Sequence, residues 1–207
     1  DKRRPRRKGS FQKARYGRLC KEKLNLREAI SKSIKNQKMV SEREWLPELE
    51  KKIYQDPADI VISTNGGYPL DQNMYQAVKG MTAAEATVRK GGVIIMLAQS
   101  GDGTGGDHFY HQLADEPDIC KTMASFRSRG RQETAPDQWQ SQILLRILMY
   151  ASVIYVSDMA DEVVERMHMT PAHSLEEALQ KAKSILGKED PTVTAIPDGI
   201  AVVVRKQ

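Results

Sequence analysis

The chain has 207 residues, of which 40% are hydrophobic and 29% are charged, and its formal net charge is +5. These proportions are typical of a globular protein. No apolar run reaches the roughly 20 residues that cross a bilayer, so we expect neither a transmembrane helix nor a membrane partner.

Cysteine usage and the N-terminus narrow the class of protein. Cys20 and Cys120 stand far apart, and neither belongs to a CxxC pair. This argues against a disulfide framework or a zinc site and indicates a reducing, cytoplasmic location. The basic N-terminus is not followed by an apolar region, so no signal peptide is predicted. The first residue is Asp rather than Met, which indicates a fragment or a processed chain.

The charge is unevenly distributed. Residues 1–55 carry 18 Lys and Arg against 7 Asp and Glu, a net +11, whereas residues 56–207 carry 14 against 20, a net −6. We interpret 1–18 as disordered or as a basic arm, and 19–54 as helical, with a capping box at Ser41 and Glu44. A basic arm can contact nucleic acid or an acidic partner, but no DNA-binding motif follows it. A solvated tail is therefore favoured, and nucleic acid is not the expected partner.

From residue 56 onward, strands and helices alternate, which predicts a second segment at 56–207. The pattern is that of an α/β domain with a mostly parallel sheet and helices on both faces. Ser174 and Glu177 predict a capping box for the last helix, and Gly187 predicts its end. In chain order we expect strands at 59–63, 91–99, 152–157 and on both sides of 197–199, and helices at about 70–89, 107–114, 116–128, 137–150 and 173–187.

The stretch "TNGGYPLDQNMYQAVKGM" at 64–81 carries the first candidate site. Its two glycines permit positive φ, and the following helix start is expected to offer free N–H groups to a carboxylate or phosphate. Tyr75, Gln76 and Lys79 share one helical edge. Together they supply a hydroxyl, an amide and a cation to an anionic, hydroxylated small molecule. The alternative, which spacing alone favours, is a surface helix with Lys79 solvated and Tyr75 half-buried.

The glycine-rich loop "SGDGTGG" at 100–106 is the second candidate. Its N–H groups could cradle a phosphate, but Asp102 and Asp107 would repel one, so we interpret it as a structural turn. Trp139 lies near the start of a helix that Asp137 is predicted to cap. Its ring can cover an aromatic ligand or, as is more usual, pack on the core.

The four histidines, His108, His111, His168 and His173, form no metal-binding motif, and no metal ligand is predicted. His108 and His111 are three positions apart, and we interpret them as a partly exposed pair at a helix start. Acidic residues after the third strand are interpreted as a solvated helix start.

Five sequence stretches resemble the C-terminal domain of the nickel-dependent lactate racemase family. The resemblance covers about 56–207, whereas residues 1–45 do not share it. The stretches are "DIVISTNGGYPLDQNMYQAVKGM" (59–81), "GGVIIMLAQSGDGTGG" (91–106), "WQSQILLRILMY" (139–150), "PAHSLEEALQKA" (171–182) and "IPDG" (196–199).

The resemblance implies two α/β domains with an active site between them, a nickel-pincer nucleotide cofactor, and racemisation of lactate or another 2-hydroxy acid by hydride transfer. Tyr75, Gln76 and Lys79 match the family's Tyr-Gln-x-x-Lys motif. The resemblance gives Lys79 and Gln76 catalytic roles and places Tyr75 and Trp139 against the cofactor. The family's catalytic histidines, cofactor-bearing lysine and nickel ligand belong to an N-terminal domain, so this chain alone is expected to be inactive. The alternative is a non-catalytic remnant or binding module with a basic arm.

Overall fold

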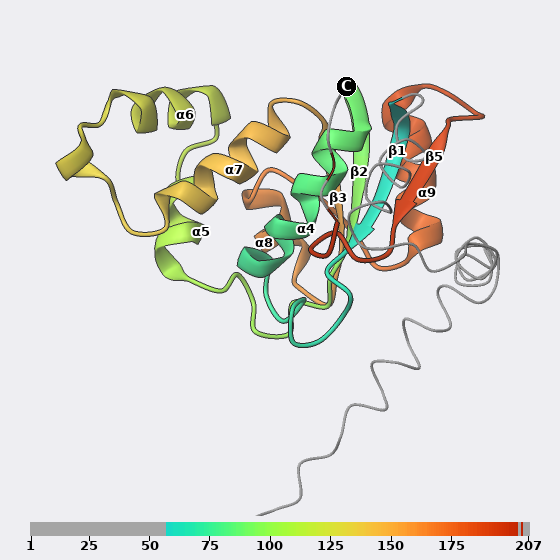
Figure 1. Cartoon of the computed structure of the whole chain (residues 1–207), viewed down its shortest axis with the longest axis horizontal. Coiled ribbons are helices and arrows are strands. Elements are labelled where there is room, and N and C mark those ends of the chain that lie inside the picture. The colour runs from blue at the N-terminus through green and yellow to red at the C-terminus, as the bar shows by residue number, and fades with distance from the viewer. Residues whose placement is uncertain (1–56, 203, 205–207) are drawn as a thin grey trace, which may run out of the picture. The chain divides into compact units, whose positions relative to one another are not determined.

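The computed structural model describes residues 57–202 and residue 204 (Figure 1). The basic arm predicted at 1–18 and the helices predicted at 19–54 lie outside these residues. Among the described residues, no helix is both long enough and apolar enough to cross a membrane.

A five-stranded sheet in the order β4-β3-β2-β1-β5 forms the centre of the domain. All four strand pairs are parallel, as the alternation of strands and helices predicts. The three central strands are almost continuously apolar because both of their faces are covered. The strands are β1 (Ala58–Thr64), β2 (Val88–Leu97), β3 (Ser152–Val156), β4 (Thr170–Ala172) and β5 (Val193–Ile196).

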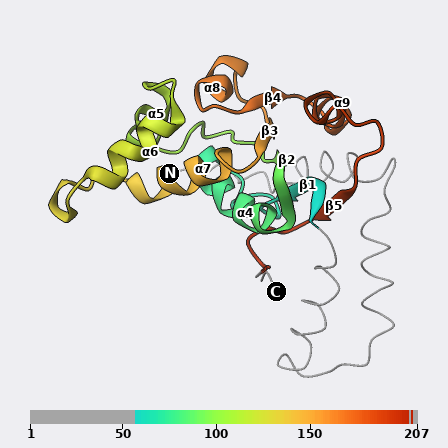
Figure 2. The same ribbon diagram turned by 90° about the horizontal axis from the view of Figure 1, so that it is seen from above.

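Helices cover both faces of the sheet, as predicted. α4, α7 and α8 lie on one face and α9 on the other, while α5 and α6 pack beside α7 at the end far from β5 (Figure 2). The helices are α4 (Met74–Thr87), α5 (Asp107–Ala114), α6 (Ile119–Ser128), α7 (Gln138–Leu148), α8 (Asp161–Arg166) and α9 (Leu175–Leu186), with a 3-10 turn η1 (Arg131–Glu133).

The main core lies between the sheet and the layer of α4 and α7. Alternate strand residues point to opposite faces. Val61, Ile94 and Tyr155 face this core and meet Met81 and Leu144, all of them fully buried. This packing fixes the start of α4 next to the start of α7, where the candidate residues lie.

The predicted helix caps are confirmed in part. Ser174 Oγ accepts a hydrogen bond from Glu177 N at 3.1 Å, but the Glu177 carboxylate takes the His173 N–H instead of closing the capping box. Gly187 ends α9 with φ 60°, as predicted. α4 begins at Met74 rather than near residue 70 because the Asn73 side chain accepts from Gln76 N.

The sequence prediction was wrong at two strands. β4 was not predicted, since its three residues are too few to show an alternation. A strand was expected after Pro197–Gly199, but the described residues beyond Gly199 form no strand. There the chain turns back, with Ala201 N bonded to Asp198 O at 3.3 Å.

A charged cluster around Asp59 joins the amino ends of three segments. Asp59 is only 5% exposed, and its carboxylate accepts from Arg89 Nε and Lys188 Nζ, each at 2.7 Å. Thr192 adds its N–H at 2.7 Å and its hydroxyl at 2.9 Å. Chiefly the Lys188 ammonium, and then the Arg89 guanidinium, hold the pKa of this carboxyl well below its usual range. The cluster ties β1 to β2 and to the turn before β5.

Candidate functional site

The first turn of α4 lies at the carboxyl edge of the sheet, directly after the β1 loop. Gly66 and Gly67 have φ of 76° and 97°, as predicted, and the Tyr68–Pro69 peptide is cis. In parallel α/β sheets this edge is where ligands bind. Both glycine-rich loops and the candidate helix residues meet there.

The prediction of free N–H groups at the start of α4 was wrong. Met74 N donates to Gly103 O and Tyr75 N to Thr104 O, both at 3.0 Å. Gln76 N donates to Asn73 Oδ1 at 3.0 Å, and Ala77 N to Asn73 O at 3.1 Å. With these four donors bonded, an anion at this edge must be bound by side chains rather than by the helix N-terminus.

The glycine-rich loop at 100–106 is the structural turn that we predicted, and it caps α4 with its carbonyl groups. Gly105 has φ 85°, and a Cβ placed there would lie 2.6 Å from Asn73 Cγ and 2.9 Å from Tyr75 Cβ. Only glycine allows this close approach. At its other end, Ser100 Oγ is hydrogen-bonded to the buried Tyr155 hydroxyl at 2.5 Å.

Lys79 and Gln76 form one pair of site residues. Lys79 Nζ donates to Gln76 Oε1 at 2.6 Å, and both side chains are half-buried. This bond leaves the Gln76 amide nitrogen directed away from the lysine, so a cation and an amide donor lie side by side. The spacing of three residues predicted that the two side chains share one edge of the helix, but not the bond between them.

Tyr75 and Trp139 form a second pair, on neighbouring helices. Their ring centroids are 5.9 Å apart at 88°, and the centroid of the Phe109 ring lies 5.4 Å from that of Tyr75 at 78°. Both are edge-to-face contacts. Trp139 remains 52% exposed, so it packs against Tyr75 and also offers a free aromatic surface.

Asp137 and Gln140, which the sequence motifs did not indicate as site residues, also contact Tyr75. Asp137 has φ 59° and makes no side-chain capping bond, which corrects the predicted cap. Burial first, and then the Asp137 carboxylate, raise the pKa of the Tyr75 phenol above its usual value. Gln140 Nε2 donates to the Tyr75 carbonyl at 2.6 Å. In the sequence, their position within two residues of Trp139 was the one sign that Asp137 and Gln140 belong to the site.

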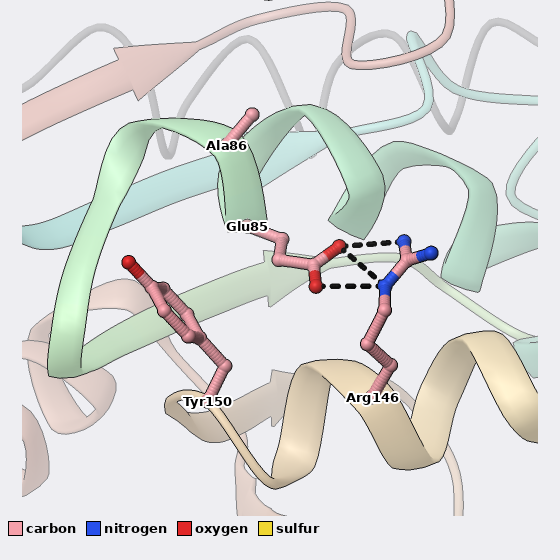
Figure 3. Close-up of a pocket in the computed structure, with 4 residues that line it drawn as sticks. All are labelled: Glu85, Ala86, Arg146 and Tyr150. Carbon is pink, nitrogen blue, oxygen red and sulfur yellow. Dashed lines mark hydrogen bonds and ion pairs between the residues drawn. The ribbon is translucent and has the colours of Figure 1, made fainter. Parts of the chain in front are cut away.

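A surface hollow lies at the opposite ends of α4 and α7, lined by Glu85, Ala86, Arg146 and Tyr150 (Figure 3). Glu85 and Arg146 face each other there and form a bidentate ion pair with distances of 2.7 to 3.2 Å. Ten residues of helix separate Glu85 from Tyr75, or about 15 Å. The hollow is therefore distinct from the candidate site.

Three of the four histidines bond to other residues of the domain. His111 bonds the Asp115 carboxylate at 3.1 Å, His168 Nε2 bonds Leu113 O at 2.9 Å, and His173 pairs with Asp161 at 3.2 Å. His108 and His111 are both exposed on α5, as predicted. Within the described residues, no cluster of His, Cys, Asp or Glu could hold a metal ion.

The five-stranded parallel sheet with helices on both faces defines the class of protein as α/β, and a cation, an amide and two aromatic rings lie at its carboxyl edge. Comparison with known proteins then identifies the family. The chain belongs to the lactate racemase C-terminal domain family, whose model matches residues 53–204.

Two relatives support this membership. Lactate racemase of Thermoanaerobacterium thermosaccharolyticum is 53% identical over 152 residues, covering 73% of this chain and 35% of that protein. Lactate racemase of Lactiplantibacillus plantarum is 53% identical over 148 residues, covering 71% and 35%. The solved lactate racemase apoprotein of the first organism matches with a TM-score of 0.71 over 73% of this chain and 36% of its own. The chain thus spans about a third of the length of these relatives.

Proposed function

We propose that this chain is the C-terminal domain of a racemase or epimerase of lactate or a related 2-hydroxy acid. It supplies one wall of an active site that an N-terminal domain completes. The relatives at 53% identity are named lactate racemases, and about two thirds of their length lies outside the match. The pairing of Lys79 with Gln76 at 2.6 Å is the observation that carries the proposal.

The pair has the chemistry to bind a 2-hydroxy acid. A lysine ammonium has three donors, of which one is directed to Gln76 Oε1, and the other two can bind a carboxylate. That bond also orients the Gln76 amide, so its nitrogen can donate to a second substrate oxygen. Lys79 thereby binds the carboxylate of the substrate, and the hydrogen bond from Gln76 sets the orientation of the substrate around that carboxylate.

The aromatic pair suits a flat cofactor. A half-exposed Trp139 ring held edge-to-face by Tyr75 provides a rigid apolar wall, the kind of surface that covers a planar pyridine ring. We assign the nickel-pincer nucleotide to this wall and its metal ligands to the N-terminal domain.

When bound, the cofactor supplies a hydride acceptor for the carbinol carbon of the substrate. The residues of this chain bind and orient: Lys79 and Gln76 hold the substrate, while Tyr75 and Trp139 exclude water from one side. Proton transfer is assigned to the N-terminal domain, so the chain by itself is not expected to racemise lactate.

Complementation tests the proposal. The chain is mixed with a cofactor-loaded N-terminal domain of a family member, and conversion of L-lactate is followed by optical rotation. Racemisation should require both parts and should be lost with Lys79→Ala but retained with Lys90→Ala, an exposed control lysine on β2. Absence of activity with the wild-type chain, or equal activity with Lys79→Ala, would contradict the proposal.

A further inference from the structure

Gln140 is a completely buried polar side chain between α7 and α4. Its Nε2 donates to the main-chain oxygen of Tyr75 at 2.6 Å, across 65 positions of sequence. In an α-helix, the carbonyl of residue i accepts the N–H of residue i+4. The Tyr75 carbonyl is therefore also the one that bonds Lys79 N. A single side chain of α7 thus bonds to the helical turn that carries Tyr75, Gln76 and Lys79.

The same turn of α7 also holds the Tyr75 side chain. Trp139 packs edge-to-face against the Tyr75 ring, and the Asp137 carboxylate interacts with its phenol. The backbone and the ring of Tyr75 are thus fixed by three residues within four positions at the start of α7, where Asp137 directly precedes the helix. This arrangement couples the location of Lys79, on α4, to that of Trp139, on α7.

The other end of the Gln140 amide has no such partner. Gln140 Oε1 is buried and has no hydrogen-bond partner in the described part of the chain. A buried acceptor without a partner destabilises a fold, and an apolar residue of the same size would pack between the helices without that penalty. An amide at this position therefore points to a role for its N–H beyond filling space.

We propose that Gln140 is a positioning residue that sets the first turn of α4 so that Lys79 and Tyr75 face one ligand. The inference rests on the proposed function for the identity of that ligand. The placement of the turn, however, is a property of the chain without any ligand, and it can be measured separately.

The test compares Gln140→Leu, which removes the donor, with Gln140→Met, which keeps the length of the side chain but also has no N–H to donate to the Tyr75 carbonyl. Gln142→Leu, two positions along α7, is the control. Amide hydrogen exchange is measured on the full chain at Lys79, at Ala84 later in α4, and at Ala182 in α9. In both Gln140 variants, exchange should accelerate about fivefold at Lys79, as for the loss of one net hydrogen bond, and remain unchanged at Ala84 and Ala182.

A second readout is the titration of Tyr75, followed by NMR of tyrosine labelled at Cζ and assigned with Tyr75→Phe. In both Gln140 variants the midpoint should move down toward the usual tyrosine value, because the ring loses its fixed place beside Asp137. Unchanged exchange at Lys79 together with an unchanged Tyr75 titration would overturn the proposal.

Equal acceleration at Lys79, Ala84 and Ala182, or unfolding of both variants, would also overturn it, because Gln140 would then serve only the stability of the core. Neither readout involves lactate or cofactor. If the complementation assay failed while exchange changed locally at Lys79, the proposed function would be wrong and the positioning role would stand.

Discussion

The contact between Gly105 and the start of α4 gives a quantitative prediction. Gly105→Ala would place a Cβ 2.6 Å from Asn73 Cγ, in a residue whose φ is 85°. The left-handed backbone costs an alanine about 1–2 kcal/mol. Overpacking against a fixed neighbour costs about 1–3 kcal/mol. We therefore expect the free energy of unfolding to fall by about 2–5 kcal/mol.

Two other glycines of the same loop separate these effects. Gly103 has φ 69° but nothing within 4 Å of an added Cβ, so Gly103→Ala should show only the backbone cost of about 1–2 kcal/mol. Gly101 has neither a positive φ nor a close neighbour, so Gly101→Ala should not destabilise the chain. Urea denaturation of the three variants at one temperature provides the ranking.

The difference between Gly105→Ala and Gly103→Ala measures how closely the loop is packed on Asn73 and Tyr75. If the two variants lost the same stability within about 0.5 kcal/mol, the loop would not be pressed against the helix. It would then be wrong that the carbonyl groups of the loop, rather than a bound anion, accept the hydrogen bonds of the N–H groups at the start of α4.

Three further predictions concern the stability of the fold. A double-mutant cycle of Glu85→Gln and Arg146→Met should give a coupling of about 0.5–1 kcal/mol that declines with salt, and a salt-independent coupling would argue against the ion pair. Because the pKa of Asp59 is lowered in the folded state, its ionised carboxylate stabilises the fold above the ordinary pKa of a carboxyl, and this stability is lost as the pH falls below that value. In Asp59→Asn, the free energy of unfolding should therefore depend less on pH between about pH 5 and pH 1. The same pH dependence in the variant and the wild type would refute this role of Asp59. Tyr155→Phe removes the hydroxyl bonded to Ser100 and should lower urea stability by about 0.5–1.5 kcal/mol, whereas no loss would show that this bond is not formed.

The sequence predicted those parts of the fold that depend on local patterns. Continuous apolar runs located β1, β2 and β3, and the alternation with helices predicted the parallel sheet. Ser174 and Gly187 correctly marked the ends of α9 because capping depends on residues three or four positions apart. β4 escaped prediction because three residues carry no periodic signal.

The candidate site was predictable along α4 but not across helices. The spacing of Gln76 and Lys79 predicted that they share one edge of α4, and in the structure Lys79 Nζ donates to Gln76 Oε1 there. The N–H groups at the start of α4 bond to Gly103 and Thr104, which lie about 30 positions away in the sequence. Local spacing cannot predict such bonds, and these N–H groups were therefore predicted to be free. The roles of Asp137 and Gln140 likewise depend on the packing of α7 against α4, which no local pattern encodes.

The measurement that most directly tests the central claim compares lactate with lactamide, its neutral amide, in the complemented enzyme. If Lys79 binds the substrate carboxylate, the wild-type chain should strongly prefer lactate. Lys79→Met should lower kcat/KM for lactate by about 30- to 1,000-fold, the loss expected for a charge-assisted contact, and leave lactamide nearly unaffected. An undiminished preference for lactate in Lys79→Met would contradict the claim that this edge of α4 binds the substrate anion.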